Sequence, residues 1–437
     1  MSLPVVVPRG EHTLSRKQID PDALRVLYRL HQDRFVAYLV GGSVRDLLVG
    51  RRPKDFDIGT SAHPYQVKRL FRNCWIIGRR FRLAHVRFGQ KTIEVATFRR
   101  KLSAEELAIA DTPQPPDPGT PDRGTVGHVR LLHRDNTFGT PEEDAFRRDF
   151  TVNSLFYDIG SLSIIDYTGG LDDLKARVIR CIGDPPERFQ EDPVRMLRAV
   201  AMAARLDFAI DPPIESAIAA HRTEIAKSAP ARLIEELYKL LRAGAAQRAF
   251  QLLAERRLFE PVSARLQAAC GEALWRSLAA LDAYRNRFEE APDTLTNPIL
   301  LGSLIAPLGL AASIPRTGHG RDGERLPAPS LGMLPLARRD VERLQQILTL
   351  QRRLMDMNAS PRARRALMHR GLFREALTWL EIHGNAPEVL EHWRGFIEAA
   401  QTFDGEPEAE QPGPRRRRPR RRGRRRLGHG PRRPEGH

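Results

Sequence analysis

The hydrophobic pattern of the first hundred residues switches repeatedly between strand-like and helix-like periodicity. The run Tyr38–Val40 is apolar and favours β structure, so it predicts a buried strand that ends at Gly41 and Gly42. Ser43 stands where a helix N-cap is expected, and the residues up to Val49 predict a short helix. The same pattern predicts an N-terminal helix over 12–30, a strand at 55–59, a helix at 64–72, and strands at 84–89 and 92–98. These segments indicate a head of the α+β class with a mixed sheet.

The remainder of the chain has mostly helical periodicity. Residues 101–135 contain the run PQPPDPGTPDRG and predict a flexible surface loop. Helices are predicted at 170–178, 192–206, 213–226, 231–242, 245–256 and 263–288. A stretch rich in glycine and proline at 315–335 predicts a linker, and two or three helices are expected between 337 and 401.

The length of 437 residues is more than one ordinary domain needs, and 41% apolar residues can build a sizeable core. We expect an N-terminal segment with its helix (1–30), the α+β head (31–165), an all-α neck (166–260), an all-α body (261–401) and a tail (402–437). The three cysteines are far apart and odd in number, which predicts neither a disulfide framework nor a zinc site. With no long apolar run near the N-terminus, we expect a cytoplasmic protein without membrane insertion.

The positive charge is concentrated at the C-terminus. Residues 414–437 hold twelve arginines and one glutamate, so they carry +11 of the formal net charge of +17. A segment of this composition predicts a disordered arm that binds RNA phosphates, with a solubilising tail as the alternative. An acidic stretch at 404–410 precedes it and is expected to shield the arm. The arginines expected to bind RNA are Arg415, Arg416, Arg417, Arg418, Arg420, Arg421, Arg422, Arg424, Arg425 and Arg426.

Two glycines and, shortly after them, two aspartates give the first sign of chemistry. Gly41 and Gly42 let the backbone come close to a phosphate, and the N–H groups of the following helix start, with the Ser43 hydroxyl, form an anion site. In the run KDFDI, alternation places Asp55 and Asp57 on one strand face and the apolar residues on the other. Two carboxylates beside a phosphate cradle can share hard metal ions such as Mg²⁺. The sequence therefore predicts a site for a nucleoside triphosphate and a divalent metal.

The motifs around these residues resemble a known family. GGSVRD followed by DFDIGT resembles the signature of class II nucleotidyltransferases of the DNA polymerase β superfamily, which include CCA-adding tRNA nucleotidyltransferases and bacterial poly(A) polymerases. Further blocks match in order: EVATFR (94–99), RRDFTVNSLFYD (147–158), EDPVRMLRA (191–199) and PARLIEELYKLL (230–241). The resemblance covers residues 12–260. It implies a polymerase β-like head and two Mg²⁺ ions, or Mn²⁺ in their place, held by Asp55 and Asp57.

A third carboxylate is needed for the same chemistry, and two residues compete for the role. Asp149 lies in the RRDFTVN block of the resembling family and is our first choice as the catalytic acid, with Glu94 as a supporting acid. Asp149 can also be a helix-end residue, and Glu94 an edge-strand charge. The sequence does not separate the two.

The block EDPVRMLR predicts the start of a helix. Pro193 suits the first helical position and Asp192 the N-cap, and Arg195 and Arg198 share one helix face. The resemblance implies that Asp192 and Arg195 contact the incoming base, with a carboxylate acceptor and a forked donor in place of a template base. The nucleotide-binding residues expected from the motifs are Gly41, Gly42, Ser43, Arg45, Asp46, Arg148, Asn153, Asp192, Arg195 and Arg198.

A basic run distinguishes two branches of this family. GRRFRLAHV (78–86) resembles the poly(A) polymerase branch, whereas CCA-adding enzymes of this class usually carry a shorter GxxHGTV-like sequence. The run assigns RNA binding to Arg79, Arg80 and Arg82. An arginine-rich C-terminus also resembles bacterial poly(A) polymerases, and a sequence-blind arm suits an enzyme that accepts many RNA ends.

The sequence thus predicts a template-independent polynucleotide adenylyltransferase that adds AMP from ATP to RNA 3′ ends. A CCA-adding enzyme is the nearer alternative, and a non-catalytic RNA-binding protein is the second. The intact set of Asp55, Asp57, Glu94 and Asp149 argues against the second alternative. We expect RNA 3′ ends and ATP as binding partners, RNA-decay proteins as further ones, and a monomer.

Overall fold

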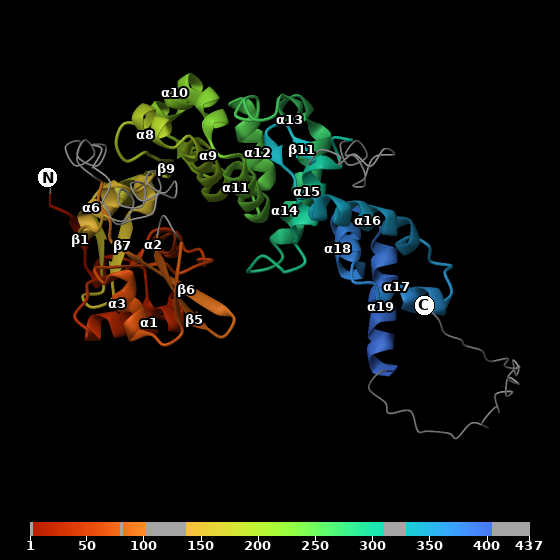
Figure 1. Cartoon of the computed structure of the whole chain (residues 1–437), viewed down its shortest axis with the longest axis horizontal. Coiled ribbons are helices and arrows are strands. Elements are labelled where there is room, and N and C mark those ends of the chain that lie inside the picture. Colours follow the sequence, from red (N-terminus) through yellow and green to blue (C-terminus); the bar gives the residue numbers. More distant parts are fainter. Residues whose placement is uncertain (1–2, 79–81, 102–136, 310–328, 404–437) are drawn as a thin grey trace, which may run out of the picture. The chain divides into compact units, whose positions relative to one another are not determined.

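The computed structural model describes residues 3–78, 82–101, 137–309 and 329–403 (Figure 1). By its internal contacts the chain divides into two compact units, Met1–Pro387 and Glu388–His437. The predicted boundaries at residues 30, 165 and 260 lie inside the first unit and stay predictions. Within the described ranges, no helix combines the length and apolar character that a membrane span requires.

The head is built on a mixed sheet of eight strands in the described part of the chain. Its strand order is β1-β8-β7-β2-β3-β6-β5-β4, in which β3 and β6 are parallel and the other neighbours antiparallel. The strands are β1 (Val5–Val7), β2 (Ala37–Val40), β3 (Ile58–Thr60), β4 (Cys74–Ile77), β5 (Leu83–Phe88), β6 (Lys91–Thr97), β7 (Leu155–Asp158) and β8 (Ser163–Asp166). The predicted α+β head with a mixed sheet is confirmed, although β1, β4, β7 and β8 were not among the predicted strands.

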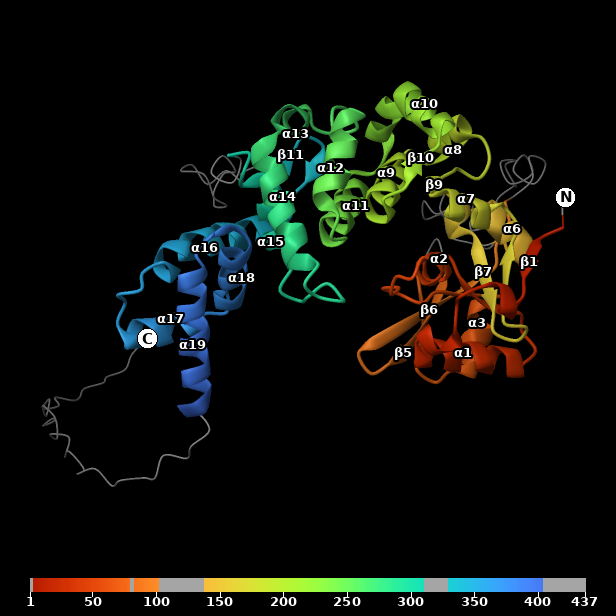
Figure 2. The ribbon, with the colours of Figure 1, turned by 180° about the vertical axis from the view of Figure 1, so that it is seen from behind.

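Helices α1 (Pro21–Gln32) and α3 (Pro64–Leu70) pack against each other and against one face of this sheet (Figure 2). On that face the side chains of Val86 and Ile93 are buried. The predicted N-terminal helix over 12–30 begins only at Pro21. Pro21 suits the first helical position, and the Asp20 carboxylate caps the helix by accepting a hydrogen bond of 2.8 Å from Asp22 N.

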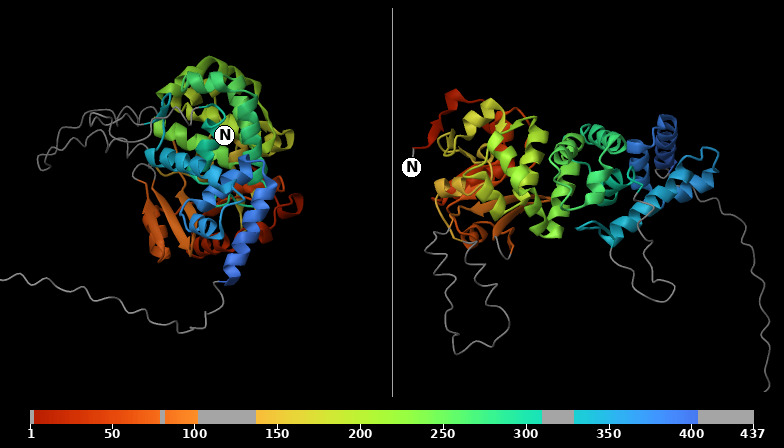
Figure 3. Two further views of the ribbon diagram at one scale, coloured as in Figure 1. Left: turned by 90° about the vertical axis from the view of Figure 1, so that its right-hand side faces the viewer. Right: turned by 90° about the horizontal axis from the view of Figure 1, so that it is seen from above.

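Beyond residue 185, the described parts of the chain are mostly helical (Figure 3). The further helices are α6 (Pro141–Phe146), α7 (Gly170–Ala176), α8 (Pro185–Glu191), α9 (Val194–Leu206), α10 (Pro212–His221), α11 (Pro230–Arg242), α12 (Ala246–Glu255), α13 (Ala264–Ala269), α14 (Glu272–Arg285), α15 (Asn297–Ile305), α16 (Arg338–Leu354), α17 (Pro361–Met368), α18 (Phe373–His383) and α19 (Pro387–Phe403). Two short strand pairs accompany them, β9 (Val178–Ile179) with β10 (Ala209–Ile210) and β11 (Ser330–Leu331) with β12 (Leu334–Pro335). Neck and body are therefore helical but not purely so.

Two predictions about these helices were wrong. The single helix predicted over 263–288 is two helices, because Gly271 adopts an extended conformation between α13 and α14. Four helices, α16 to α19, stand where two or three were expected. The predicted loop 101–135 lies almost wholly outside the described residues, whereas the end of the predicted linker forms the β11–β12 hairpin.

Candidate active site

The turn between β2 and α2 (Gly42–Leu48) has a geometry that only glycine adopts easily. Gly41 has φ +73° and ψ −131°, and a Cβ there would lie 3.0 Å from Nη1 of Arg148. Ser43 was predicted to be the N-cap of this helix, but it lies within the helix, and Gly41 is the N-cap. Ser43 is buried and donates its hydroxyl to the carbonyl oxygen of Val40 (3.0 Å). The Ser43 hydroxyl is thus engaged by the backbone, while the first N–H groups of α2 have no acceptor within the helix.

The two aspartates lie just before β3 and not in it. The strand begins at Ile58, and the Asp57 carbonyl accepts a hydrogen bond of 3.0 Å from Val40 N at the end of β2. The predicted alternation holds, since Asp55 and Asp57 are exposed while Phe56 and Ile58 are buried. This hydrogen bond places Asp57 beside the end of β2, the strand that leads into Gly41.

Three carboxylates share this region. Val95 on β6 pairs with Ile58, which brings Glu94 next to Asp57. Asp57 keeps contact with solvent, but the protein atoms around its carboxylate reduce the hydration of the charge. This effect, together with the negative charges of Glu94 and Asp55, raises the pKa of Asp57 to about 6, while Arg148 opposes the shift. Mutual repulsion among carboxylates is what a hard divalent cation relieves, so the donor set fits Mg²⁺. Within the described residues, no three acidic, histidine or cysteine side chains already form a metal-binding group.

Arg148 lies between the glycine turn and a neighbouring acid. Its guanidinium donates to Asp144 Oδ2 (2.9 Å from Nη2) and to the Asn153 carbonyl (3.2 Å), and it lies over the Phe156 ring. These contacts hold a positive charge beside Gly41, where a triphosphate is expected.

Arg45 and Asp46 are buried and form an ion pair with each other. Arg45 donates through Nε and Nη2 to Asp46 Oδ1 (2.8 and 2.6 Å) and through Nη1 to the Asn153 side chain. Asp46 also accepts from Arg205 on α9 (2.6 Å). The structure thus brings Arg45, Asp46 and Asn153 together, as predicted for neighbours of the nucleotide, in a network that joins the head to the neck.

Asp149 is held by two arginines of α9. Arg195 Nε lies 2.6 Å from Oδ1 and Arg198 Nη1 lies 2.8 Å from Oδ2. Burial by itself would raise the pKa of Asp149, but the two guanidinium groups outweigh it and hold the pKa below its usual value. Glu94, by contrast, is one of the charges that raise the pKa of Asp57. Asp149 is therefore coupled to the neck arginines, and Glu94 to the aspartate pair.

Asp192 is engaged in the same way from α11. Arg232 donates two hydrogen bonds to its carboxylate, Nη1 to Oδ1 (2.9 Å) and Nη2 to Oδ2 (2.6 Å). Asp192 Oδ1 also accepts from Val194 N (3.2 Å), so the predicted capping role is partly right, although Pro193 takes the N-cap position of α9. Both residues expected to contact the base, Asp192 and Arg195, are thus fixed in position by other charged side chains.

A pocket of about 450 Å³ opens beside these residues. Its walls come from α2, the turn after α6, and the neck helices α9 and α11: Arg45, Asp149, Phe150, Asn153, Arg198, Ala201, Met202, Arg205, Glu236, Lys239, Leu240 and Ala243. A pocket of this size with both polar and apolar walls suits one nucleotide.

Comparison with known families decides the assignment. "Poly A polymerase head domain" matches residues 37–180, "Probable RNA and SrmB- binding site of polymerase A" matches 207–269, and "Polymerase A arginine-rich C-terminus" matches 330–427. The chain belongs to the poly(A) polymerase branch of the tRNA nucleotidyltransferase family. The three matches follow one another along this poly(A) polymerase family member, and the second crosses the predicted boundary at residue 260.

Individual relatives agree with the family. Poly(A) polymerase I of Salmonella typhimurium is 51% identical over 257 residues, which are 59% of this chain and 53% of the relative, so the match spans about half the relative's length. The CCA-adding enzyme of Lactobacillus helveticus is 36% identical over 240 residues, 55% of this chain and 54% of the relative. The crystal structure of the Bacillus stearothermophilus CCA-adding enzyme in complex with CTP has 29% identity and a TM-score of 0.57, covering 87% of this chain and 83% of that one.

Three residues of the site were missed by the sequence reasoning. Arg205, Arg232 and Glu236 bind Asp46, Asp192 and Arg198, in that order. Arg232 and Glu236 belong to the PARLIEELYKLL block. This block matched the family, but its charged residues were not predicted to form ion pairs with the site. An arginine and a glutamate four apart on one helix face were the available signal.

Most of the residues expected to bind RNA lie outside the part of the chain that the structure describes. Arg79, Arg80 and the arginines of 415–426 lie outside the described residues. Arg82 is described, and its guanidinium lies over the ring of Tyr65 at 5.8 Å from the centroid.

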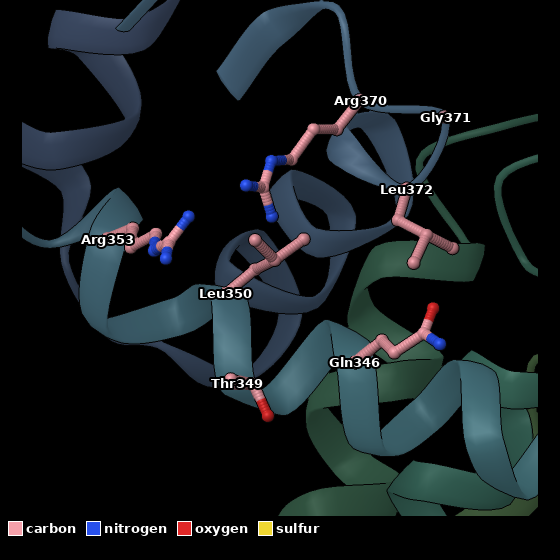
Figure 4. A pocket seen from close by; sticks show the side chains of 7 residues that line it. All are labelled: Gln346, Thr349, Leu350, Arg353, Arg370, Gly371 and Leu372. Atoms are coloured by element: carbon pink, nitrogen blue, oxygen red, sulfur yellow. The ribbon is translucent and has the colours of Figure 1, made fainter. Parts of the chain in front are cut away.

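A second pocket, of about 410 Å³, lies between α16 and the connection from α17 to α18 (Figure 4). It is lined by Gln346, Thr349, Leu350, Arg353, Arg370, Gly371 and Leu372. None of the catalytic or nucleotide-binding residues predicted from the sequence lies there, so the nucleotide is assigned to the first pocket.

Proposed function

We propose that this protein adds AMP from ATP to RNA 3′ ends without a template and releases pyrophosphate. The observation that carries the proposal is the charge coupling of Asp55, Asp57 and Glu94 beside the Gly41 turn. This arrangement is found in a chain that is 51% identical over 257 residues to a poly(A) polymerase I.

Asp55, Asp57 and Glu94 form the carboxylate set of this proposal. Asp55 and Asp57 would hold Mg²⁺, and Mn²⁺ is an acceptable substitute. The bound metal supplies activation of the attacking 3′-hydroxyl and neutralises charge on the triphosphate. Glu94 takes the place of third carboxylate ahead of Asp149, because Asp149 already neutralises Arg195 and Arg198.

The nucleotide would bind with its phosphates at the glycine turn. Backbone amides after Gly41 and the guanidinium of Arg148 supply the donors for the triphosphate. The base would enter the pocket between head and neck, where a carboxylate and a guanidinium can recognise the acceptor and donor atoms of adenine. Asp192 and Arg195 are the residues proposed for this contact, and Arg232 and Asp149 fix their orientation. Neither of the two lines the pocket itself, whose charged walls include Asp149 and Arg198.

CCA addition is the second candidate function. The 36% identity to a CCA-adding enzyme and the solved CCA-adding neighbour support it. The higher identity to poly(A) polymerase I and the GRRFRLAHV run favour adenylation. The non-catalytic alternative is disfavoured, since the carboxylate set is intact. We also propose that the protein is a cytoplasmic monomer that interacts with RNA-decay proteins.

The test is extension of a labelled RNA with ATP and Mg²⁺, read on a denaturing gel together with pyrophosphate release. Wild-type protein should lengthen the RNA, and Asp57→Asn should not, because the isostere removes the charge a metal needs. RNA binding by Asp57→Asn, measured by anisotropy, serves as the folding control. If Asp57→Asn keeps more than about a tenth of the activity, Asp57 is not a ligand of a catalytic metal, since metal-centred charge stabilisation supplies several kcal/mol.

A further inference from the structure

An exposed row of side chains runs across the sheet from the acidic site to the sheet edge. Glu94 on β6 lies opposite His85 on β5, and His85 lies opposite Trp75 on β4. On the other side of Glu94 stands Asp57, next to the start of β3. Directly paired residues of neighbouring strands point to the same face. Asp57, Glu94, His85 and Trp75 therefore form one row.

This row lies on the face that α3 does not cover. The alternate residues Cys74, Val86 and Ile93 are buried on the side of α3, which packs on all three strands. Trp75, at the end of the row, is 52% exposed, and Ile77, two residues further along β4 on the same face, is 50% exposed. A single exposed tryptophan is ordinary, but two large apolar side chains at the end of a row that starts at catalytic carboxylates form a distinct surface.

The order of the strands places the nucleotide pocket on one side of the aspartates and the row of Glu94, His85 and Trp75 on the other. The nucleotide pocket is lined from the β2 and β7 side of the aspartates, through Arg45 on α2 and Asn153 just before β7. In phosphoryl transfer the attacking and leaving oxygens are roughly in line, on opposite sides of the phosphorus. The 3′-hydroxyl then approaches from the β6, β5 and β4 side.

We propose that Trp75, with Ile77 beside it, is the platform on which bases near the RNA 3′ end stack. This proposal rests on the proposed function and names the substrate site on the acceptor side. Aromatic side chains stack on any base, so the platform suits an enzyme that extends RNAs of many sequences. Arg87, exposed on β5 on the same face, supplies a positive charge for phosphates.

The position of Trp75 predicts which bases it meets. Three strand spacings of about 4.8 Å separate β4 from β3, which places Trp75 about 14 Å from the aspartates. Stacked nucleotides advance by about 3.4 Å each, so this span corresponds to about four stacked nucleotides, or fewer in an extended strand. Trp75 is therefore expected to stack on the second to fourth base from the 3′ end.

The first test is the kinetics of Trp75→Ala in the full-length protein. The KM for RNA and the RNA Kd should rise about 5- to 150-fold, the range for one lost base–aromatic stack. The KM for ATP and kcat at saturating RNA should stay within about twofold of wild type, because Trp75 touches neither the nucleotide pocket nor the carboxylates. Trp75→Phe should restore most of the RNA affinity. Tyr28→Ala, an exposed aromatic of the covering helix α1, is the matched control and should change nothing.

The second test places 2-aminopurine at each of the last six positions of the RNA and measures its fluorescence on binding, without ATP. Quenching that is strongest at positions two to four and is lost in Trp75→Ala supports the platform. Equal RNA affinity and equal quenching in Trp75→Ala and wild type would overturn it. A wild-type protein that extends no RNA would instead overturn the proposed function, and the fluorescence result would still decide the role of Trp75.

Discussion

Glu94 and Asp149 differ in the charges that surround them. Glu94 lies near Asp57 and 3.5 Å from His85 Nε2, on an exposed strand face. Asp149 is clamped by Arg195 and Arg198 at the base of the nucleotide pocket. Glu94, which repels its acidic neighbours, is available to bind a metal ion. Asp149, which is already neutralised by Arg195 and Arg198, instead orients these two arginines.

Substituting the two acids separately should give two distinct defects. Glu94→Gln should lower kcat about 100-fold or more with little change in the KM for ATP, as expected when several kcal/mol of charge stabilisation are lost at the reacting groups. Asp149→Asn should instead raise the KM for ATP and lower the unfolding free energy by about 1–3 kcal/mol, because two partly buried arginine donors lose a charged acceptor. Steady-state kinetics and urea melts of both variants check this. The reverse pattern would return the catalytic role to Asp149.

The candidate site could be predicted from sequence only where local pattern determines it. Asp55 and Asp57 follow from alternation beside a glycine turn, and Glu94 from its place in an apolar strand. The pairing of Asp192 with Arg232 spans 40 residues, and no periodicity encodes it. Asp149 was placed above Glu94 because of its position in the RRDFTVN block. The two arginines that neutralise it lie 46 and 49 residues further along the chain, beyond the reach of any local pattern.

At the scale of elements, helices α15, α16 and α18 approach each other around one glycine. A Cβ on Gly302 would lie 2.4 Å from Trp379 Cζ3 and 2.6 Å from Leu344 Cδ1. The region of α16 and α18 was predicted to be helical from its period, but α15 was not among the predicted helices. The close packing could not be predicted, because the contact residues are separated along the chain by loops.

Gly302→Ala should lower the unfolding free energy despite the better helix propensity of alanine. The propensity gain is about 1 kcal/mol, and overpacking against a fixed aromatic ring costs about 1–3 kcal/mol. Gly371→Ala is the matched control, since its Cβ would meet no atom within 4 Å. Thermal melts of both variants give the comparison. A Gly302→Ala protein more stable than wild type would show that α18 does not pack on α15 in this way.

The same helices predict a dependence of stability on pH. Burial lowers the pKa of His383 at the end of α18 to about 4, and its Nε2 lies 2.9 Å from Ser303 Oγ on α15. The folded pKa is below the ordinary value of about 6.5, so this stabilisation is complete above pH 6.5 and is lost as the pH falls toward 4. Urea melts should therefore show a loss of up to about 1.4 kcal/mol per pH unit in this window. His383→Gln should have a smaller slope than wild type, and an unchanged slope would contradict the assignment.

At the scale of the whole molecule, charge and chemistry are separated along the chain. Residues 414–437 carry +11, whereas the proposed catalytic and nucleotide-binding residues lie between Gly41 and Arg232. A run of arginines without core-forming residues predicts attraction to phosphates, with solubility as the alternative role.

Removing residues 414–437 should weaken RNA binding without affecting the chemistry. Each phosphate contact on a single strand contributes about 0.7 to the slope of log K against log salt, so six engaged arginines would lower the slope by about 4. The loss should be similar for RNAs of any sequence, because phosphate contacts carry no base information. Anisotropy titrations at several salt concentrations measure it, with turnover at saturating RNA as the control. A truncated protein with the wild-type salt slope would mean that the tail does not bind RNA.

The most direct test of adenylation is to incubate one labelled RNA of unrelated sequence with ATP, CTP, GTP or UTP in separate reactions, beside a tRNA that lacks its CCA end. We expect long extension of both RNAs with ATP and little with the other three nucleotides, since paired contacts to a base edge discriminate by about 1–3 kcal/mol each. Incorporation of CTP as efficient as that of ATP, and only onto the tRNA, would contradict it and identify a CCA-adding enzyme.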